Sequence, residues 1–478
     1  MDTPATIEVR NPRSGEIDYR ITPPTEAELR DIAASLREAQ RGWSARPLEE
    51  RLEIMQRWAN VIIEHATAIG AAEAADTGRH ELSYQIPHQV AASIQGWCKI
   101  APAILRAGSL EGRSSTAPNV GFTTQLSPYP LLGVISPWNH PFNASVLDAI
   151  PALIAGCAVL VKPSEIAPRF VEPVVESLRQ VPELAAVFQY VTGDGRTGQQ
   201  LIQCVDSVCF TGSVTNGRKV AEACAARFIP AFLEMGGKDA AIVTASADLD
   251  RAATSVLRSS AWCTGQICFS TERVYVEASV HDEFVAALVR KANELELSYP
   301  DPHAGHLGPF ILGRQAATVD AHIDDALAKG ARLVAGGKSQ NLGGGHFMKA
   351  GVLVDVTHDM RIMTEETFGP VTPVMRYTTE EEALALANDS EYGLSAAVIA
   401  GDVAEARRLG EQLNAGAIAL QDAGLSIMIV RDAEKNSFNQ SGLGGSRMGP
   451  NGLLRYFRKK ALIVNETEPM SILAMGYQ

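Results

Sequence analysis

Cys268 and Glu234 are the residues of this 478-residue chain whose types and setting suit covalent chemistry. A cysteine thiolate attacks electrophilic carbon, and a nearby carboxylate can take a proton from a thiol or from water. Cys268 closes the run Gly265–Cys268, and Glu234 precedes Gly236–Gly237, where the missing side chains let backbone approach another group. Most cysteines are buried structural residues, and either motif alone leaves that alternative favoured for Cys268. Together the two motifs predict a thiol nucleophile served by a carboxylate base.

The segment before Glu234 alternates short apolar runs with helical patterns. Five runs have the length and composition of buried strands: Leu131–Ile135, Ala158–Val161, Val187–Val191, Ser207–Phe210 and Ile229–Leu233. Helices are predicted between them near residues 143–156, 168–180, 197–203 and 215–226. This alternation predicts an α/β fold with a doubly wound parallel sheet, which binds ligands beyond the carboxyl ends of its strands.

Polar residues follow these strands. The Asn139 amide can donate to an oxyanion that forms beside the nucleophile, although asparagine is also common at turns. A carboxylate at Glu165 can accept the hydroxyls of an adenosine ribose while Lys162 holds the other edge, and a surface ion pair is the alternative. Ser213 caps a predicted helix whose free N–H groups can bind a pyrophosphate; an ordinary capped helix fits this motif equally well.

The run Gly193–Gly198 matches the Gly-x-Gly-x-x-Gly fingerprint of dinucleotide-binding turns. That fingerprint belongs after the first strand of a sheet, with an acidic residue about 20 positions further on. Here at least two strands come first, and residues 213–218 hold no acid. We therefore predict a tight turn near the cofactor at Gly195 and Gly198, with the main phosphate contacts elsewhere.

The rest of the chain divides into three parts. The first hundred residues are predicted to be helical at 25–40, 48–75 and 83–105, and Thr25–Glu28 has the pattern of a capping box. A half-polar strand is predicted at 119–127, and its exposed edge needs a pairing strand. The natural partner is the strand at 460–465 of this or another subunit.

From about residue 236 a second α/β unit is predicted, with a Gly-rich surface loop at 336–346. Its helices are expected at 252–262, 281–297, 314–329, 380–388 and 402–414, and its strands at Ala240–Val243, Arg273–Val276, Arg332–Ala335, Gly351–Val354, Thr372–Tyr377 and Ala396–Ile399.

Composition excludes several classes of partner. The formal net charge of −13 argues against nucleic acid or an anionic membrane surface. No apolar run approaches the roughly 18–20 residues that cross a bilayer, and the first 30 residues lack the apolar core of a signal peptide. The seven cysteines have no metal-ligand spacing, so no metal site is predicted. These features predict a reduced, cytoplasmic protein.

Six blocks of the chain resemble, in order, the signatures of the NAD(P)-dependent aldehyde dehydrogenase superfamily: Pro137–Asn139, Lys162–Glu165, Phe210–Ser213, Glu234–Lys238, Gly265–Cys268 and Glu366–Pro370. The resemblance covers about residues 10–465. It implies a Rossmann-like cofactor domain (1–107 and 128–234), an α/β catalytic domain (235–458) and a small β bridging element for oligomerisation (108–127 and 459–478). Homodimers or homotetramers are expected.

The resemblance also implies catalytic roles. Cys268 is expected to attack the aldehyde carbon, with the oxyanion held by the Asn139 amide and the Cys268 backbone N–H. After hydride transfer leaves a thioester, Glu234 is expected to activate the water that hydrolyses it. Glu366 is expected to bind the nicotinamide ribose, with Phe368 steadying the ring. The expected NAD(P) site comprises Ile135, Trp138, Lys162, Ser164, Glu165, Gly195, Gly198, Phe210, Gly212, Ser213, Met235, Gly236, Glu366 and Phe368. Because Glu165 repels a 2′-phosphate, NAD is expected to be preferred, with NADP possible.

The aldehyde is expected to meet a mostly apolar wall. By the register of the motifs this wall comprises Phe142, Leu147, Ile267 and Phe269, with Met428 and Phe438 closing the mouth. An aromatic or medium-chain aliphatic aldehyde is therefore predicted in preference to acetaldehyde or succinic semialdehyde.

The chain departs from the family pattern in three places. Arg447 stands where many members have a glutamate, and it is the one nearby candidate cation for an acid-bearing semialdehyde. The block 434–440 lacks the usual Pro-Phe-Gly-Gly. His140 follows Asn139 where an aromatic or small residue is expected. Its side chain either forms a hydrogen bond with the substrate or packs within the loop.

Two rival functions are weighed. CoA-acylating relatives commonly lack the base at the Glu234 position, which argues against that activity. A catalytically silent structural or binding member is disfavoured because Cys268, Asn139 and Glu234 are all present.

Overall fold

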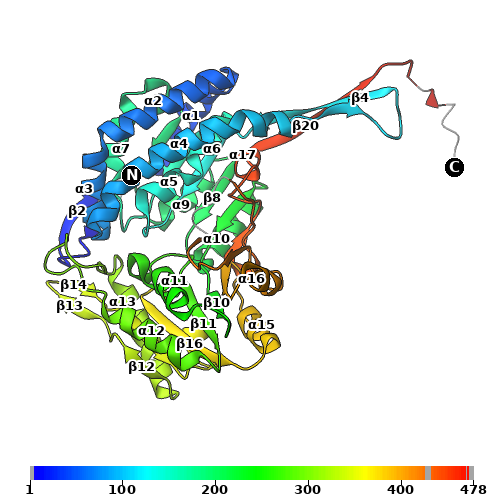
Figure 1. The fold of residues 1–478 in the computed structure, drawn as a ribbon. Coiled ribbons are helices and arrows are strands. Elements are labelled where there is room, and N and C mark those ends of the chain that lie inside the picture. Colours follow the sequence, from blue (N-terminus) through cyan, green and yellow to red (C-terminus); the bar gives the residue numbers. More distant parts are fainter. Residues whose placement is uncertain (1–4, 426–431, 470, 473–478) are drawn as a thin grey trace.

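The chain forms two α/β units and a projecting β arm (Figure 1). The computed structural model describes residues 5–425, 432–469 and 471–472. Among these residues, no helix combines the length and the apolar character needed to cross a bilayer.

The first unit is built on a six-stranded sheet in the order β19-β9-β8-β5-β6-β7. Five strands are parallel, as predicted, and β19 is antiparallel to β9. The strands are β5 (Leu131–Ile135), β6 (Ala158–Lys162), β7 (Phe188–Tyr190), β8 (Ser207–Thr211), β9 (Ala231–Glu234) and β19 (Gly442–Leu443). The helices are α5 (Pro141–Leu147), α6 (Ala149–Ala155), α7 (Val171–Arg179), α8 (Pro182–Ala185), α9 (Gly195–Ile202) and α10 (Val214–Ala226).

The N-terminal helices pack on the same unit (Figure 1). They are α1 (Glu26–Ala45), α2 (Leu48–Glu64), α3 (Ala66–Thr77) and α4 (His80–Gly108), preceded by the hairpin of β1 (Ile7–Arg10) and β2 (Ile17–Ile21). Thr25 and Glu28 form the predicted capping box, since each side chain accepts from the other residue's backbone N–H. Their core includes Trp43, Trp58 and Trp97, which are all buried.

The second unit is a seven-stranded sheet in the order β12-β15-β16-β11-β10-β17-β18, parallel except between β12 and β15. Its strands are β10 (Asp239–Val243), β11 (Thr271–Glu277), β12 (Arg332–Ala335), β15 (Gly351–Val354), β16 (Val371–Tyr377), β17 (Ser395–Ile399) and β18 (Ala417–Leu420). Its helices are α11 (Leu249–Ala261), the 3-10 turn η1 (Trp262–Gly265), α12 (His281–Asn293), α13 (Gly313–Ala328), α14 (Arg361–Thr364), α15 (Glu380–Asn388) and α16 (Val403–Gly410). The sequence patterns missed β18.

The Gly-rich segment predicted to be a loop forms a small hairpin instead. Strands β13 (Gln340–Leu342) and β14 (Gly345–Phe347) pair antiparallel. Gly343 and Gly344, with φ of 61° and 94°, make the two-residue turn between them. Positive φ at both turn positions is what a tight hairpin requires, and glycine supplies it without strain.

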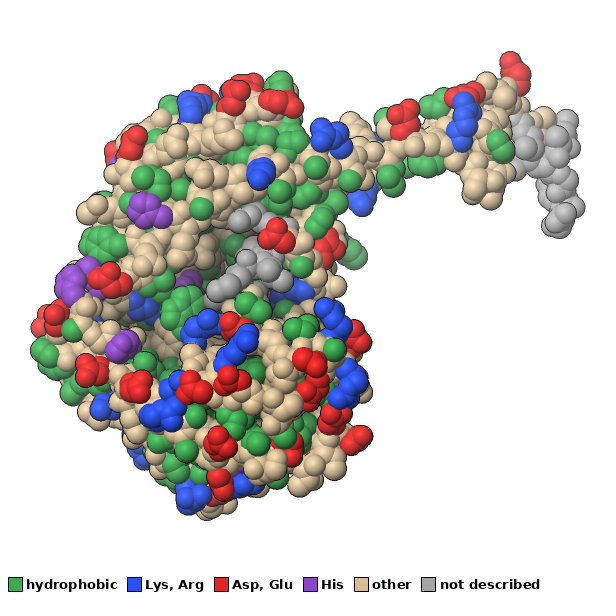
Figure 2. All heavy atoms as spheres, in the orientation of Figure 1, with side chains coloured by type: hydrophobic (Ala, Val, Ile, Leu, Met, Phe, Trp, Pro, Cys, Tyr) green, Lys and Arg blue, Asp and Glu red, His purple; other side chains and the backbone are tan. Residues whose placement is uncertain are grey.

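The arm is a three-stranded sheet that stands away from the body (Figure 1). Strand β20 (Phe457–Asn465) pairs along its whole length with β4 (Val120–Pro128), and β3 (Glu111–Arg113) pairs on the other side. The predicted pairing of the two long strands is therefore confirmed within one chain. Leu462, Ile463 and Val464 are exposed on β20, and Figure 2 shows hydrophobic side chains along the arm.

The stretch after β18, which lies within the predicted catalytic-domain range of 235–458, packs on the first unit. It comprises η3 (Asn439–Ser441), β19 and α17 (Asn451–Leu454). Gly442 pairs with Glu234 on β9, and Leu453 and Tyr456 are fully buried in the first core. Pairing with β9 covers a sheet edge that would otherwise be open.

Candidate active site

Cys268 lies in the loop between α11 and β11, at a kink in the chain. Cys263 and Thr264 adopt left-handed φ of 54° and 60°, so Cys263 is part of the kink and not of the preceding helix. Gly265 follows with φ of 66°, and a Cβ there would lie 2.3 Å from the Gly369 carbonyl oxygen. Only glycine fits that position, which explains its place in the motif before Cys268.

Gln266 fixes the same loop from inside. Its side chain is completely buried. The side-chain oxygen accepts from the Ile311 backbone N–H at 3.0 Å, and the amide nitrogen donates to the Pro309 carbonyl oxygen at 3.3 Å. Gln266 therefore anchors the loop to a neighbouring segment and leaves Cys268 to face the cavity.

Cys268 is half-buried, and its surroundings favour the neutral thiol. Burial raises the pKa of Cys268 to about 12, and the carboxylates of Asp239, Glu366 and Glu234 raise it further. The Lys435 ammonium opposes this rise. Because the thiolate is the nucleophile, attack requires a base or a compensating cation beside the sulfur.

Asn139 reaches the nucleophile loop through its side-chain amide, which donates to the Gln266 carbonyl oxygen at 3.0 Å. The Asn139 backbone carbonyl oxygen accepts from Arg79 Nη1 at 2.8 Å, and Arg79 Nη2 donates to the Cys263 carbonyl oxygen at 2.8 Å. Arg79 is buried and ties the two loops together. Sequence reasoning missed it because it lies 60 positions before Asn139.

Glu234 lies at the carboxyl end of β9 and is held by two residues that sequence reasoning missed. The Ser437 hydroxyl donates to Glu234 Oε2 at 2.6 Å, and Lys435 Nζ lies 3.6 Å from the same oxygen. Lys435 also stands over the Phe269 ring, 5.1 Å from its centroid. Both residues belong to the block that lacks the family pattern, so the motif offered no signal for them.

A cavity of about 520 Å³ opens beside Cys268 and Asn139, along the carboxyl ends of the first sheet's strands. All fourteen residues predicted for the cofactor site line it. Sequence reasoning missed other lining residues, including Lys219 on α10 and Arg314 on α13. The residues predicted to bind the cofactor and the predicted nucleophile Cys268 therefore line the same cavity.

One end of this cavity is shaped for a sugar and a flat ring. A Cβ at Gly236 would lie 2.2 Å from Glu366 Oε1, and the Gly237 N–H donates to that oxygen at 3.3 Å. Burial raises the pKa of Glu366 to about 8, with the Glu272 carboxylate adding to the rise. Phe368 meets Trp138 edge to face, with ring centroids 5.5 Å apart. Glycine at 236 therefore leaves a carboxyl group open to hydroxyl donors.

Glu272 holds the Glu366 loop in place. Its carboxylate accepts the backbone N–H groups of Thr367 and Phe368, each at 2.7 Å. Lys238 Nζ donates to Glu272 at 2.7 Å, so the buried carboxylate has a buried counter-charge.

The other end of the cavity presents a helix N-terminus and an ion pair. The Ser213 hydroxyl accepts from the Asn216 N–H at 3.4 Å and caps α10, as predicted. Lys162 Nζ donates to Glu165 Oε2 at 3.3 Å. Burial lowers the pKa of Lys162, and Glu165 opposes that effect. These groups suit a dinucleotide's phosphates and ribose.

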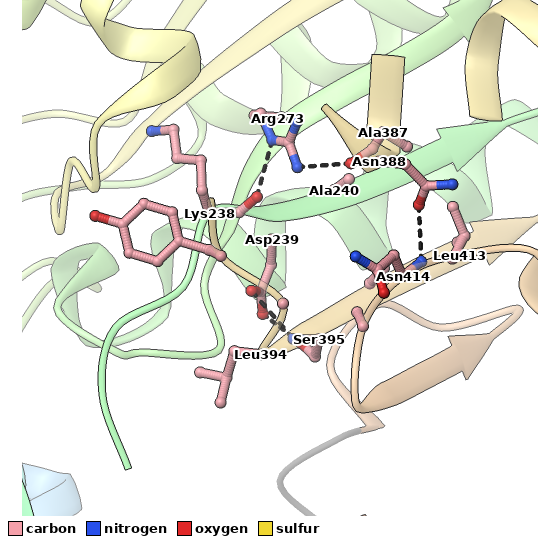
Figure 3. A pocket seen from close by; sticks show the side chains of 14 residues that line it. Lys238, Asp239, Ala240, Arg273, Ala387, Asn388, Leu394, Ser395, Leu413 and Asn414 are labelled. Carbon is pink, nitrogen blue, oxygen red and sulfur yellow. Dashed lines mark hydrogen bonds between the residues drawn. The ribbon is translucent and has the colours of Figure 1, made fainter. Parts of the chain in front are cut away.

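A small cavity lies beside Lys238 and Asp239, the residues that follow Gly237 in the chain (Figure 3). A Cβ at Gly237 would touch both Asp239 Oδ1 and the Cys268 carbonyl oxygen. Burial raises the pKa of Asp239 to about 7, and the Ser395 hydroxyl donates to it. Figure 3 shows Asp239 directed at Ser395, so this carboxyl group supports the loop.

None of the residues predicted for the substrate wall that the structure describes lines the large cavity beside Cys268, and Phe142 belongs elsewhere. Phe142 is fully buried and packs on Phe170, 5.9 Å between centroids, so it belongs to the first core and does not face substrate. Leu147 and Phe269 are half-buried, Ile267 is buried and Phe438 is 40% exposed. Met428 lies outside the described residues.

An aromatic residue that the sequence analysis did not select stands next to His140. Trp262 is 43% exposed, and its ring centroid lies 6.3 Å from that of His140. Burial, with Arg79 nearby, lowers the pKa of His140 to about 3, so the ring is neutral at physiological pH.

Arg447 is not a free cation for substrate. Its Nη2 donates to Asp148 Oδ2 at 2.8 Å and to the Thr211 hydroxyl at 2.5 Å. Arg455 also pairs with Asp148, and all three charged groups are buried or nearly so. The Arg447 guanidinium is therefore paired with the buried carboxylate of Asp148.

A grouping of three potential metal ligands lies elsewhere, on the surface of the described part of the chain. Glu81 Oε1 lies 3.3 Å from His80 Nδ1 and 3.8 Å from His303 Nδ1. Glu81 and His303 are exposed and none of the three lines the large cavity. The group has no part in the chemistry beside Cys268.

Known proteins with similar sequences and structures give a consistent picture. The family model described as "Aldehyde dehydrogenase family" matches residues 1–462. A Mycobacterium ulcerans protein named "Putative succinate-semialdehyde dehydrogenase", with NADP(+) in its name, is 33% identical over 94% of this chain and 87% of its own. The 4,4′-diapolycopene aldehyde oxidase of a Methylomonas species is 35% identical over 87% of this chain and 78% of its own. The Anabaena variabilis structure of PutA aligns with a TM-score of 0.95 at 48% identity, covering 98% of this chain and 99% of its own.

Proposed function

The chain belongs to the aldehyde dehydrogenase family, and from that premise we propose that it oxidises an aromatic or medium-chain aliphatic aldehyde to the carboxylic acid. One observation carries the proposal: Cys268, Asn139 and the fourteen predicted cofactor residues line a single cavity. Glu234 is close enough to Cys268 for its charge to act on the thiol. A nucleophile, an amide donor and a base therefore meet at one place.

Addition of the aldehyde is the first step. Cys268 loses its proton to a neighbouring base, and its sulfur bonds to the carbonyl carbon, whose oxygen becomes an oxyanion. The Asn139 amide and the Cys268 backbone N–H donate to that oxygen. For the amide this means exchanging the Gln266 carbonyl for the oxyanion, which is a stronger acceptor.

The cofactor of this family is NAD(P). The residues fit it: Glu366 at one end of the cavity and the Lys162–Glu165 pair at the other would accept its ribose hydroxyls, and the N-terminus of α10 would bind its phosphates. When bound, NAD(P)+ supplies the hydride acceptor that converts the adduct to a thioester.

Hydrolysis completes the cycle. Glu234 takes a proton from water, and the oxygen attacks the thioester carbon, releasing the carboxylic acid and the Cys268 thiol. Ser437, which donates to one carboxylate oxygen, leaves the other oxygen to accept. The presence of this base supports water over CoA as the acyl acceptor.

The substrate proposal rests on the aromatic side chains around the nucleophile. Phe269 follows Cys268, and Trp262 and Phe438 are both well exposed. The Methylomonas relative is named as an oxidase of 4,4′-diapolycopene aldehyde, which supports an apolar substrate. The mycobacterial relative favours a second candidate, a semialdehyde bearing a carboxylate, although Arg447 is already paired with Asp148.

An aldehyde panel decides between these candidates. Benzaldehyde, hexanal, acetaldehyde and succinic semialdehyde are incubated with NAD+ or NADP+, with and without CoA, and NADH or NADPH is followed by absorbance. We expect the highest kcat/KM with benzaldehyde or hexanal and no need for CoA. The highest value with succinic semialdehyde would overturn the substrate proposal, and a strict CoA requirement would overturn hydrolysis. No turnover with any aldehyde would indicate a silent member.

We further propose a cytoplasmic homo-oligomer with the cofactor domain in the first unit and the catalytic domain in the second. The seven free cysteines support a reducing compartment. The exposed Leu462, Ile463 and Val464 on the arm support contact with another copy. Light scattering of the wild type and of Ile463→Glu tests this, since a charge on a shared strand should lower the assembled mass.

A further inference from the structure

Lys435, Ser437 and Glu234 form a chain of three polar groups beside the nucleophile. The Lys435 ammonium donates to the Ser437 hydroxyl oxygen at 3.0 Å, and that hydroxyl donates to Glu234 Oε2 at 2.6 Å. The ammonium itself lies 3.6 Å from the same carboxylate oxygen. Lys435 is only 8% exposed, so water screens its charge weakly.

Lys435 also faces the loop that carries the nucleophile. Its ammonium stands 5.1 Å from the centre of the Phe269 ring, one residue after Cys268. The charged groups that act on the Cys268 sulfur are Lys435, Asp239, Glu366 and Glu234. Three of these groups are acids that disfavour a thiolate, and Lys435 is the cation that counters them.

The backbone fixes Lys435 in this place. Its N–H donates to the Ser446 hydroxyl at 3.2 Å, and that hydroxyl donates to the Met448 carbonyl oxygen at 2.9 Å. The Met235 N–H donates to the Ser441 carbonyl oxygen at 2.8 Å, which joins the same stretch to the strand end that carries Glu234. Lysine and glutamate are thus held by one connected stretch of backbone.

We infer that Lys435 is a positioning residue for both halves of the reaction: its charge stabilises the Cys268 thiolate, and through Ser437 it orients the Glu234 carboxylate. The inference rests on the proposed function, in which Cys268 attacks and Glu234 activates water. Before the thiol proton moves, the Lys435 ammonium pairs with the Glu234 carboxylate. After the proton has moved to Glu234, the carboxyl group is neutral and the ammonium pairs with the Cys268 thiolate. The net charge of the cluster stays the same, so the transfer creates no uncompensated charge.

The size of the effect follows from general values. A cation within about 4–6 Å shifts the pKa of an acid by about 1–3 units. A rise of one unit lowers the thiolate fraction about tenfold, but a more basic thiolate is about threefold more nucleophilic, since the Brønsted coefficient is about 0.4–0.5. At a pH below the pKa of Cys268, loss of the Lys435 charge should therefore slow attack by the sulfur about threefold for each unit by which the pKa rises.

Alkylation by iodoacetamide tests this without aldehyde or cofactor. The rate at the Cys268 peptide is measured by mass spectrometry from pH 6 to 10 in wild type, Lys435→Met, Lys435→Arg and Ser437→Ala, with Cys268→Ala as the blank. We expect Lys435→Met to be alkylated at least about threefold more slowly than the wild type at each pH in this range. Lys435→Arg keeps the charge and should react at close to the wild-type rate, and Ser437→Ala should slow alkylation less than Lys435→Met does.

Two results would overturn the inference: an unchanged alkylation rate at every pH in Lys435→Met with a wild-type melting curve, or an equal slowing in Lys435→Arg. If Lys435→Met does not fold, Lys435→Gln serves as the uncharged variant under the same criteria. Because alkylation needs no aldehyde turnover, slower alkylation of Lys435→Met than of a wild type that oxidises no aldehyde would contradict the proposed function and leave the thiolate role of Lys435 standing.

Discussion

The side-chain amide of Asn139 donates a hydrogen bond of 3.0 Å to the backbone carbonyl oxygen of Gln266, two residues before Cys268. The amide is thus held against the nucleophile loop before any substrate arrives. A donor that is already in place loses little entropy when it turns to the oxyanion.

Asn139→Ala should lower kcat by about 10²–10³, because one oxyanion donor is lost. Alkylation of Cys268 should change by less than about twofold, since the thiol keeps its neighbours. Steady-state NADH production and iodoacetamide labelling give the two values. A kcat within a factor of about three of the wild type would contradict the role of Asn139.

Cys268→Ala should abolish oxidation and retain NAD+ binding, measured by fluorescence quenching. Cys263→Ala is the matched control, because Cys263 lies in the same kink but is buried with its backbone carbonyl bound to Arg79. That variant should remain active. Turnover at the wild-type rate in Cys268→Ala would rule out the thiol as nucleophile.

Glu234→Gln should give a burst of NADH and then stall, because an amide cannot accept a proton from water. Ser437 can still donate to the glutamine oxygen, so the local structure should persist. Stopped-flow absorbance resolves the burst from the steady state. Rapid steady turnover would show that another group activates the water.

The polar residues at the carboxyl ends of the strands could be predicted because an apolar run followed by polar residues is a local sequence pattern. Each apolar run ends in polar residues that a parallel sheet brings to one edge, and this rule pointed to Lys162, Glu165 and Ser213, which line the large cavity. The resemblance supplied other members of the cofactor set, including Glu366 and Phe368, which line the same cavity.

Asn139 and Glu234 were selected at the ends of β5 and β9 in the same way, whereas Cys268 was selected from its motif and lies in the loop before β11. The β1–β2 hairpin was missed because its strands carry few apolar residues, and β18 was missed because its apolar run is only four residues long.

The supporting side chains could not be predicted because they come from distant segments. Arg79 reaches Asn139 from the start of α4, and Lys435 reaches Glu234 across 201 positions, between residues 234 and 435. Phe142 was misassigned because the helix that begins at Pro141 turns it toward Phe170. Arg447 was predicted to be available because nothing in the sequence pairs it with Asp148.

Glu165→Gln should shift the cofactor preference toward NADP+. The carboxylate that accepts from Lys162 lies in the cavity, and removing it frees the ammonium to meet a 2′-phosphate. Like charges held in contact cost several kcal/mol, so the ratio of kcat/KM for NADP+ over NAD+ should rise about tenfold or more. A wild-type enzyme that already prefers NADP+ would contradict the role given to Glu165.

Glu73→Gln should make stability less dependent on pH. Glu73 is buried, one of its carboxylate oxygens has no partner, and burial raises its pKa from an ordinary value of 4.5 to about 8. The folded state favours the neutral acid, so its contribution is complete below about pH 4.5 and is lost as pH rises through about 8.

The melting temperature of Glu73→Gln relative to the wild type should therefore increase from pH 5 to pH 8.5 by calorimetry. Glu64→Gln, at an exposed position on α2, should show no such trend. A constant difference for Glu73→Gln would indicate that the carboxyl group titrates normally in the folded protein.

The return of residues 442–457 to the first unit has a consequence for synthesis on the ribosome. The nascent chain can assemble β5 to β9 long before β19 emerges, so the β9 edge and the hollow for Tyr456 stay open during translation of about 200 further residues. Lys435 and Ser437 emerge in the same late stretch. The newly made enzyme therefore acquires its oriented base only when the last tenth of the chain docks, after which β19 covers β9 at Leu233 and Glu234 against pairing with a second nascent chain.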